Sequence, residues 1–188
     1  MINKIAVVAI LVSLLNFISI EARADNPHNP IGGLGISPDF ANDQTFFLAT
    51  YGELTVGYID ILRTTDGGTT WTKLPNGMDN IYPVTAIRVS PNFKIDHTVF
   101  VATFGNGIYQ SSDQGNSWQL FNTGLGGKMV TKLVIAGSDP DYVLFSSLPT
   151  GALYRRSSTE TAWHRILDQS FAVTVGLTTR PEFVMRTV

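Results

Sequence analysis

Short apolar runs separated by turn residues make up most of the chain after residue 30. Between Val84 and Phe121 four runs follow one another, and each either alternates apolar with polar positions or is rich in β-branched and aromatic residues. They cover 84–89, 98–103, 108–111 and 117–121. Gly105-Asn106-Gly107 and an Asp-Gln-Gly turn supply turn chemistry between them. No window of about a dozen residues after residue 24 shows a helical period, so we expect almost no helix.

The pattern repeats with a period of 45 to 47 residues. Three eight-residue stretches end at Trp71, Trp118 and Trp163, and the lead-in segment 36–50 matches 89–103 at identical spacing. A fainter lead-in precedes the third stretch. Four antiparallel strands in a repeat of this length predict one blade of a β-propeller. We therefore expect an all-β, partial propeller with blades at about 30–76, 82–124 and 128–168 and an incomplete fourth at 171–188.

Two of the three stretches carry a recognisable motif. Thr64–Trp71 and Ser111–Trp118 resemble the Asp-box, or BNR, pattern Ser/Thr-x-Asp-x-Gly-x-Thr/Ser-Trp. This pattern is found in sialidases, sortilin-type receptors, xyloglucanases and photosystem II assembly factors, all of which are β-propellers. In the third stretch Ser158 replaces the aspartate and Glu160 the glycine. The resemblance covers roughly residues 30–165 and implies the fold, but it leaves the function open because those families do different things.

The residue types of the motif suit a structural role. A short carboxylate in a hairpin turn accepts hydrogen bonds from backbone N–H groups, and glycine adopts a positive φ without strain. The tryptophan buries a large ring between adjacent sheets. In the third copy we expect the packing to be retained and the turn locking to be lost, and we expect Asp43 and Asp96 to be structural as well. The residues assigned to the motif are Thr64, Asp66, Gly68, Thr70, Trp71, Ser111, Asp113, Gly115, Ser117, Trp118 and Trp163.

One loop departs from the repeat. The segment 51–62 of the first repeat is longer than its counterpart 104–109 in the second. In related propellers this loop and the linker between blades lie opposite the Asp-box turns, on the face where ligands bind. We therefore expect a ligand face there, with a longer hairpin that merely packs as the alternative. Its candidate residues are Tyr51, Glu53, Tyr58, Asp60, Met78, Asp79, Tyr82, Phe104 and Asn106.

The sequence offers no catalytic, metal or cofactor constellation. Sialidase chemistry would need an arginine cluster, a Tyr nucleophile with a Glu partner and an acid/base Asp, and the Arg-Ile-Pro motif of that family is absent. Arg88 is the only arginine in an expected innermost strand. The three histidines, His28, His97 and His164, are scattered, so we expect no metal site. Nothing resembles a phosphate loop or a nucleophile elbow.

The N-terminus predicts export. Lys4, the apolar run 5–20 and Ala22-Arg23-Ala24 have the make-up of a signal peptide at 1–24, with an uncleaved membrane anchor as the alternative. Its removal takes away two positive charges and one negative charge, which changes the net charge from −2 to −3. With no basic run, nucleic acid is an unlikely partner, and we expect no membrane insertion after cleavage. The chain has no cysteine, so it must rely on its apolar core.

These observations favour an exported, non-catalytic propeller segment that binds a protein or a glycan. The alternatives are a fragment of a sialidase-like or other glycoside hydrolase whose catalytic residues lie outside this chain, and an assembly factor for a membrane complex. A propeller needs about four to eight blades, so three blades predict missing C-terminal blades, self-association with another copy, or an open stack that aggregates.

Overall fold

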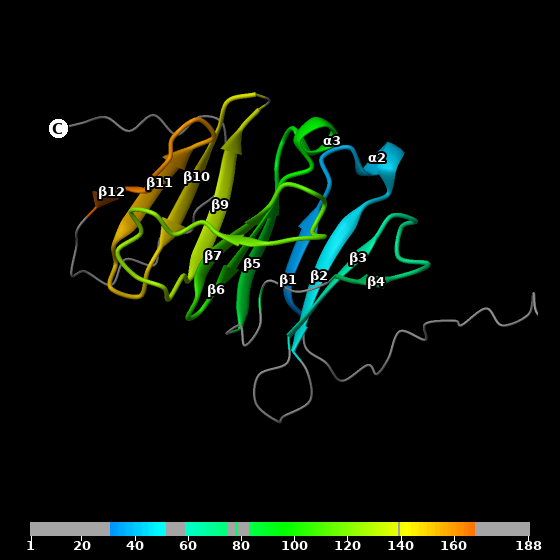
Figure 1. Ribbon diagram of the computed structural model, residues 1–188, viewed down its shortest axis with the longest axis horizontal. Helices are drawn as coiled ribbons and strands as arrows, with labels where there is room; N and C mark the ends of the chain where they lie inside the picture. The colour runs from blue at the N-terminus through cyan, green and yellow to red at the C-terminus, as the bar shows by residue number, and fades with distance from the viewer. Residues whose placement is uncertain (1–30, 52–58, 75–77, 79–82, 139, 168–188) are drawn as a thin grey trace, which may run out of the picture.

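Three four-stranded antiparallel sheets make up the structure, a computed structural model that describes residues 31–51, 59–74, 78, 83–138 and 140–167 (Figure 1). We call these sheets blades 1, 2 and 3. Blade 1 contains β1 (Ile31–Ile36), β2 (Phe46–Tyr51), β3 (Ile59–Thr64) and β4 (Thr72–Lys73). Blade 2 contains β5 (Val84–Val89), β6 (Val99–Thr103), β7 (Gly107–Ser111) and β8 (Gln119–Leu120). Blade 3 contains β9 (Lys132–Gly137), β10 (Tyr142–Ser147), β11 (Leu153–Ser157) and β12 (His164–Leu167).

Every blade has the same topology, in which sequence neighbours pair in order. The first strands β1, β5 and β9 lie next to one another across the blades, so they form the innermost row, and the fourth strands lie outermost. The Thr85 hydroxyl donates to the carbonyl oxygen of Val130 at 2.9 Å and ties blade 2 to the start of blade 3. The all-β fold class expected from the sequence is confirmed. The expected signal peptide at 1–24 and the start of a fourth blade at 171–188 lie outside the described residues.

The apolar core lies between the blades rather than inside any one of them. One cluster fills the space between blades 1 and 2, where Phe47 and Ala49 of β2 meet Ile87 of β5, all fully buried. A second cluster fills the space between blades 2 and 3, where Phe100 of β6 meets Leu133 and Leu144. Because strand side chains alternate between the two faces of a sheet, blade 2 contributes to both clusters. Stacking of one blade on the next therefore supplies the hydrophobic burial that a single sheet lacks.

The structure contains two short helices that the sequence pattern did not predict. In the described residues, helix is confined to two single turns, α2 (Phe40–Asp43) and α3 (Phe93–Asp96), at the matching Ser-Pro-x-Phe segments. Each turn ends at a residue in the left-handed region, Gln44 with φ +48° and His97 with φ +53°. Four residues are too few to show a helical period, and two single turns agree with the expectation of almost no helix. No helix in this part of the chain is long and apolar enough to cross a membrane.

Candidate functional site

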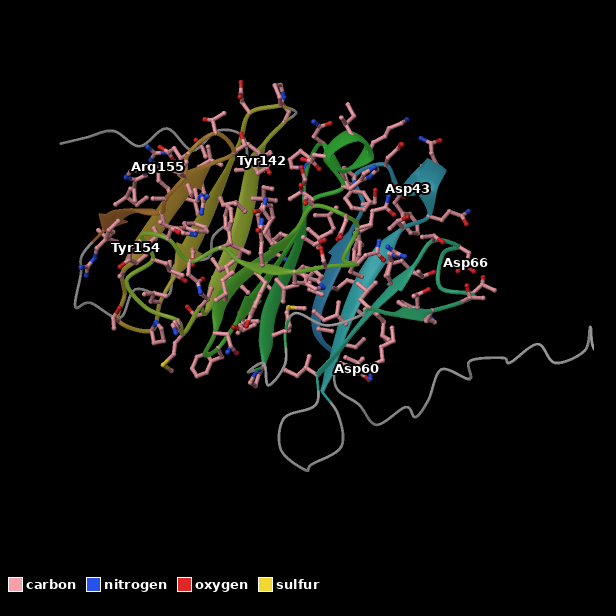
Figure 2. All side chains as sticks on the ribbon, in the orientation of Figure 1. Asp43, Asp60, Asp66, Tyr142, Tyr154 and Arg155 are labelled. Carbon is pink, nitrogen blue, oxygen red and sulfur yellow. The ribbon has the colours of Figure 1, made fainter. Side chains whose placement is uncertain are left out.

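The two ends of the stacked blades carry different kinds of side chain. We call the end with α2, α3 and the turns between the third and fourth strands the turn end. The end with the loops between the second and third strands and the linkers between blades is the linker end. In Figure 2 Asp43 of the turn end and Asp60 of the linker end lie at opposite ends of blade 1. The three tryptophan-terminated stretches 64–71, 111–118 and 156–163 are Trp turns 1, 2 and 3.

In Trp turn 1 one carboxylate organises the whole turn. Asp66 accepts hydrogen bonds from the Thr64 hydroxyl at 2.7 Å, the Thr70 N–H at 2.9 Å and the Thr70 hydroxyl at 2.6 Å. The Thr64 oxygen in turn accepts from the Gly68 N–H at 2.9 Å, and Gly68 adopts φ +98°. The hydrogen bonds from Thr70 and Thr64 favour the charged form and lower the pKa of Asp66 from 3.8 to about 2. A carboxylate held in this way is an anchor, not a proton donor near neutral pH.

Trp turn 2 repeats this geometry. Asp113 accepts from the Ser111 hydroxyl at 2.7 Å and from the Ser117 N–H and hydroxyl at 2.8 and 2.6 Å. Burial raises the pKa of Asp113, but the hydrogen bonds from Ser117 and Ser111 outweigh it and the net pKa is lowered. Gly115 has φ +89°, and a Cβ at this position would lie 2.5 Å from a Leu74 methyl carbon. A side chain at Gly115 would therefore clash with blade 1 as well as strain the turn.

A second carboxylate locks the other connection at the turn end. Asp96 accepts from the Ser90 hydroxyl at 2.6 Å and from the Thr98 N–H at 2.8 Å, which fixes the link between β5 and β6 across α3. Asp43 makes the same pair of bonds in blade 1, at 2.5 Å from Ser37 and 2.9 Å from Thr45. The two aspartates thus have the structural role expected for a position that recurs with the repeat.

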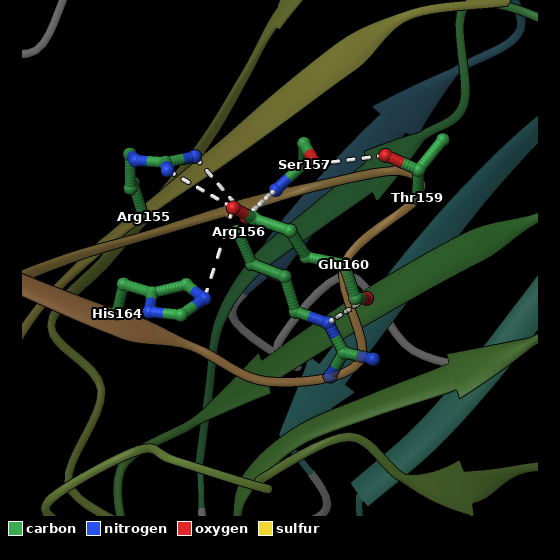
Figure 3. Close-up of polar contacts among 6 residues, drawn as sticks. All are labelled: Arg155, Arg156, Ser157, Thr159, Glu160 and His164. Atoms are coloured by element: carbon green, nitrogen blue, oxygen red, sulfur yellow. Dashed lines mark hydrogen bonds and ion pairs between the residues drawn. The ribbon is translucent and has the colours of Figure 1, made fainter.

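Trp turn 3 corrects the expectation that its lock is lost. Glu160, four residues after Arg156, folds back and accepts from the Ser157 N–H at 2.7 Å (Figure 3). The Arg155 guanidinium forms a bidentate pair with the same carboxylate, at 2.9 and 3.1 Å, and His164 Nε2 lies 3.7 Å from it. The Ser157 N–H, with help from Arg155, lowers the pKa of Glu160 against the effect of burial. A carboxylate therefore still holds this turn, but it comes from Glu160, whose longer side chain reaches the Ser157 backbone.

Two of the three tryptophans pack on the preceding blade. Trp163 is 3% exposed, and its indole N–H donates to the carbonyl oxygen of Phe121 in blade 2 at 2.7 Å. Trp118 belongs to the cluster between blades 1 and 2, and it flanks Gly115 together with Leu74 of blade 1. Trp71 differs, because it is half-buried and stacks edge-on against Phe46 of its own blade at 5.0 Å. The expectation that every indole packs on a neighbouring blade therefore holds for Trp118 and Trp163 alone.

Part of the expected ligand face lies at the linker end of blade 2. Phe104 is 40% exposed and pairs through a β-bridge with Met129, which is 45% exposed. The surrounding backbone is tied down, because the N–H of Gly107 donates to Lys128 and that of Phe104 to Pro83. Asn122 donates to the Asn106 carbonyl oxygen at 2.8 Å and accepts from the Ile108 N–H at 2.8 Å. Two exposed apolar side chains thus lie on two loops whose backbones are held in place by hydrogen bonds.

The other expected ligand-face residues have mixed outcomes. Met78 is half-buried against the core between blades 1 and 2, and Asp60 lies within β3 and pairs with Lys73 at 2.6 Å. Tyr51 is the last residue of β2. Sequence reasoning missed Met129 and Asn122, although their place in the linker after blade 2, like that of Met78 after blade 1, could have indicated them. The expected face also included Glu53, Tyr58, Asp79 and Tyr82, which lie outside the described residues.

The described residues bring together no group of three or more metal-ligating side chains. Arg88 lies in the innermost strand β5, as expected, and donates to the carbonyl oxygen of its neighbour Ile87 at 2.7 Å. Burial lowers the pKa of Arg88. The carboxylates of Asp43 and Asp96 each accept two hydrogen bonds from their own connections, and that of Asp113 accepts three. Among the described residues we identify no set of side chains that would hold a cofactor.

Comparison with known proteins agrees with the fold. No family model matches the chain, and no curated protein matches it. Among solved structures it is similar to YCF48 bound to a D1 peptide, with 17% identity and a TM-score of 0.50 over 75% of this chain and 41% of that one. It is also similar to an ancestral GH74 enzyme, with 16% identity and a TM-score of 0.52 over 73% and 20% of the two chains. The GH74 xyloglucanase from Xanthomonas campestris has 17% identity and a TM-score of 0.53 over 74% and 24%.

These neighbours are β-propeller proteins, and the chain spans about two fifths or less of their lengths. At such identities the similarity shows the shared fold of stacked four-stranded blades. It includes both a peptide-bound protein and glycan-degrading enzymes, so it does not separate binding from catalysis. The part of the chain described here is thus a three-bladed section of a β-propeller.

Proposed function

We propose that this chain is an exported Asp-box propeller segment that acts as a non-catalytic binding module for a protein or glycan partner. The export rests on the signal-peptide pattern at 1–24, and the family rests on Trp turns 1 and 2. The partner would bind at the linker end. In this proposal the repeated blades are a scaffold, and the loops that vary between blades provide recognition.

The single observation that carries the proposal is the exposed pair Phe104 and Met129. Exposed aromatic and methionine side chains are enriched at protein interfaces, and aromatic rings also stack on sugars through their apolar faces. The pair is braced by backbone hydrogen bonds to Pro83 and Lys128, so binding would require little ordering of the loop. By contrast, the carboxylates of Trp turns 1 and 2 lie at the opposite end and accept hydrogen bonds within their own turns.

The neighbours support either kind of partner. YCF48 is bound to a peptide, which supports a protein partner and is consistent with an assembly factor for a membrane complex. The GH74 enzymes support a glycan partner, and they keep open a glycoside hydrolase whose catalytic residues lie outside this chain. The internal use of Asp43, Asp96 and Asp113 favours binding over catalysis for this chain by itself.

The proposal is tested by binding of the purified chain to a peptide array and to a series of xyloglucan oligosaccharides. We expect saturable binding to one of the two classes, and we expect Phe104→Ser and Met129→Ser to weaken it by about tenfold or more. Leu120→Ser is the matched control, because Leu120 is 61% exposed on the outermost strand of blade 2 and should leave binding unchanged. Binding that survives both linker-end substitutions would overturn the proposed site. Release of reducing sugar from xyloglucan by the chain would overturn the non-catalytic assignment.

A further inference from the structure

Blade 2 has a neighbouring blade on each of its two faces. The face that it turns toward blade 1, here called the front face, carries Ile87, Val89, Val99, Val101 and Trp118, and each of these is 8% exposed or less. It packs against the back face of blade 1, which carries Phe47, Ala49, Ile61 and Leu74, each 4% exposed or less. The blade 1–blade 2 interface is therefore a pairing of one front set with one back set.

Blade 1 has the corresponding front set, but there it is exposed or only half-buried. Leu34 and Ile36 stand at the repeat positions of Ile87 and Val89, and they are 47% and 54% exposed. Phe46, Leu48 and Trp71 stand at the positions of Val99, Val101 and Trp118 and are only half-buried. Neighbouring strand residues such as Phe47 and Ala49 point to the other side, toward blade 2. No described residue covers this front face as blade 1 covers that of blade 2, and an apolar sheet face of this kind marks an interface.

Blade 3 carries the matching back set. Phe145, Ser147, Leu153 and Ile166 stand at the repeat positions of Phe100, Ala102, Ile108 and Phe121 in blade 2. The first three positions in blade 2 are fully buried, whereas the blade 3 residues are half-buried. An aromatic ring, a small residue and two aliphatic side chains are thus repeated on a face that is half-buried at these four positions, while Val134 on its innermost strand is 8% exposed. The described residues therefore carry both halves of the interface, on blades 1 and 3.

We infer that the front face of blade 1 docks on the back face of blade 3 of a second copy of this chain. Two such contacts, related by a two-fold axis, would join the three described blades of each copy into a closed ring of six, in which blade 1 of the second copy takes the place that the fourth blade expected at 171–188 would otherwise occupy. Six lies within the range of about four to eight blades that propellers use. The contact repeats the established interface between blades 1 and 2, so it requires no new kind of packing. Assembly in this way covers both apolar faces at once.

The register of the repeat predicts which residues meet. A Cβ built at Gly35 in blade 1 lies 3.2 Å from Ile87 Cβ in blade 2. In the proposed contact Leu34 takes the place of Ile87, and Val134, which pairs with Phe145 as Gly35 pairs with Phe47, takes the place of Gly35. Leu34 of one copy should therefore lie beside Val134 of the other. That separation is close to the Cβ–Cβ distance of a disulfide bond, and the chain has no cysteine of its own.

The first test measures the mass of the purified chain by light scattering across a concentration series. We expect twice the mass of one chain, and we expect Ile36→Lys to raise the dissociation constant by about 100-fold or more because it places an unpaired charge in the contact. Ile95→Lys is the matched control, because Ile95 is 71% exposed on α3 and lies outside both faces. Circular dichroism of each variant establishes that it is folded. A wild-type monomer at every concentration, or an Ile36→Lys variant that still dimerises, would overturn the inference.

The second test uses Leu34→Cys and Val134→Cys together under mild oxidation. A disulfide-linked dimer of the double variant is expected, with neither single variant forming one. A dimer of the Leu34→Cys single variant would mean that two front faces meet each other, which contradicts the proposed contact. Failure of the double variant to cross-link while the wild type is dimeric would contradict the register. An assembly larger than two copies that Ile36→Lys disperses would contradict ring closure.

Discussion

The turn end and the linker end of this molecule differ in what their side chains contact. At the turn end, Asp43, Asp96 and Asp113 each accept hydrogen bonds from the backbone and hydroxyls of their own connection. At the linker end, Phe104 and Met129 remain exposed while their backbone is braced. The carboxylates that resemble catalytic groups therefore hold the turns, and the exposed pair of the candidate site is apolar. A repeated motif reports on architecture, and the exposed side chains at the end opposite the motif indicate where a partner would bind.

Removal of a buried indole should break the turn end most severely. Trp163→Ala is expected to lower the free energy of unfolding by about 3–5 kcal/mol, because the ring fills the space between blades 2 and 3 and its N–H bonds the Phe121 carbonyl oxygen. Urea denaturation followed by circular dichroism measures the change. Leu120→Ala, at a position 61% exposed, is the control and should change the free energy by less than about 0.5 kcal/mol. Equal effects of the two substitutions would contradict the stacked arrangement.

Loss of one lock should have a smaller effect. Asp113→Asn keeps the shape of the side chain but removes the charge that Ser111 and Ser117 stabilise, and it places an NH2 donor where a carboxylate oxygen had accepted hydrogen bonds. We expect a loss of about 1 kcal/mol in the free energy of unfolding, since the site is close to water and water replaces part of the bonding. Thermal melting compares the Asp113→Asn variant with Asp141→Asn, which makes the same substitution at an exposed aspartate. If the two variants melt together, the carboxylate is not the anchor of Trp turn 2.

Acid should weaken the turn end in a defined range. The folded-state pKa of Asp66 is lowered from 3.8 to about 2, so its stabilising contribution is present above the unfolded pKa and is lost as the pH falls toward 2. The lowered pKa values of Asp113 and Glu160 act in the same direction. Urea midpoints measured between about pH 5 and pH 2 should fall, and Asp66→Asn should make the fall shallower. A wild-type profile that is flat over this range would contradict the hydrogen-bonded carboxylates.

The linker end should show the smallest effect on stability. Phe104→Ser is expected to change the free energy of unfolding by less than about 0.5 kcal/mol, because the ring is exposed and the backbone bonds of the loop remain. The same denaturation experiment measures it, and the binding assay proposed above should report a loss. A large destabilisation would show that the ring packs into the fold and would remove it from the candidate site.

Strands and turns were readable from the sequence because their signals are local. The alternation of apolar residues and the recurrence of Trp118 and Trp163 predicted the sheets and the packing of their rings. The partial exposure of Trp71 was not predictable, because it depends on which blade lies next to it and not on the motif. The lock by Glu160 was missed because a Glu at the glycine position of the motif indicates loss of the motif. In the structure its longer side chain reaches the Ser157 N–H. Single-turn helices are likewise too short to leave a periodic signal.

The stacking of neighbouring blades is tested most directly at the Trp163 indole. Nuclear Overhauser spectroscopy of the protein should show strong cross-peaks from the Trp163 ring to the Phe121 ring, whose centroids lie 6.0 Å apart, with the indole N–H bonded to the Phe121 carbonyl oxygen. The N–H should also exchange slowly with solvent, since the side chain is 3% exposed. An indole proton that exchanges freely and shows no cross-peak to Phe121 would contradict the stacked blades.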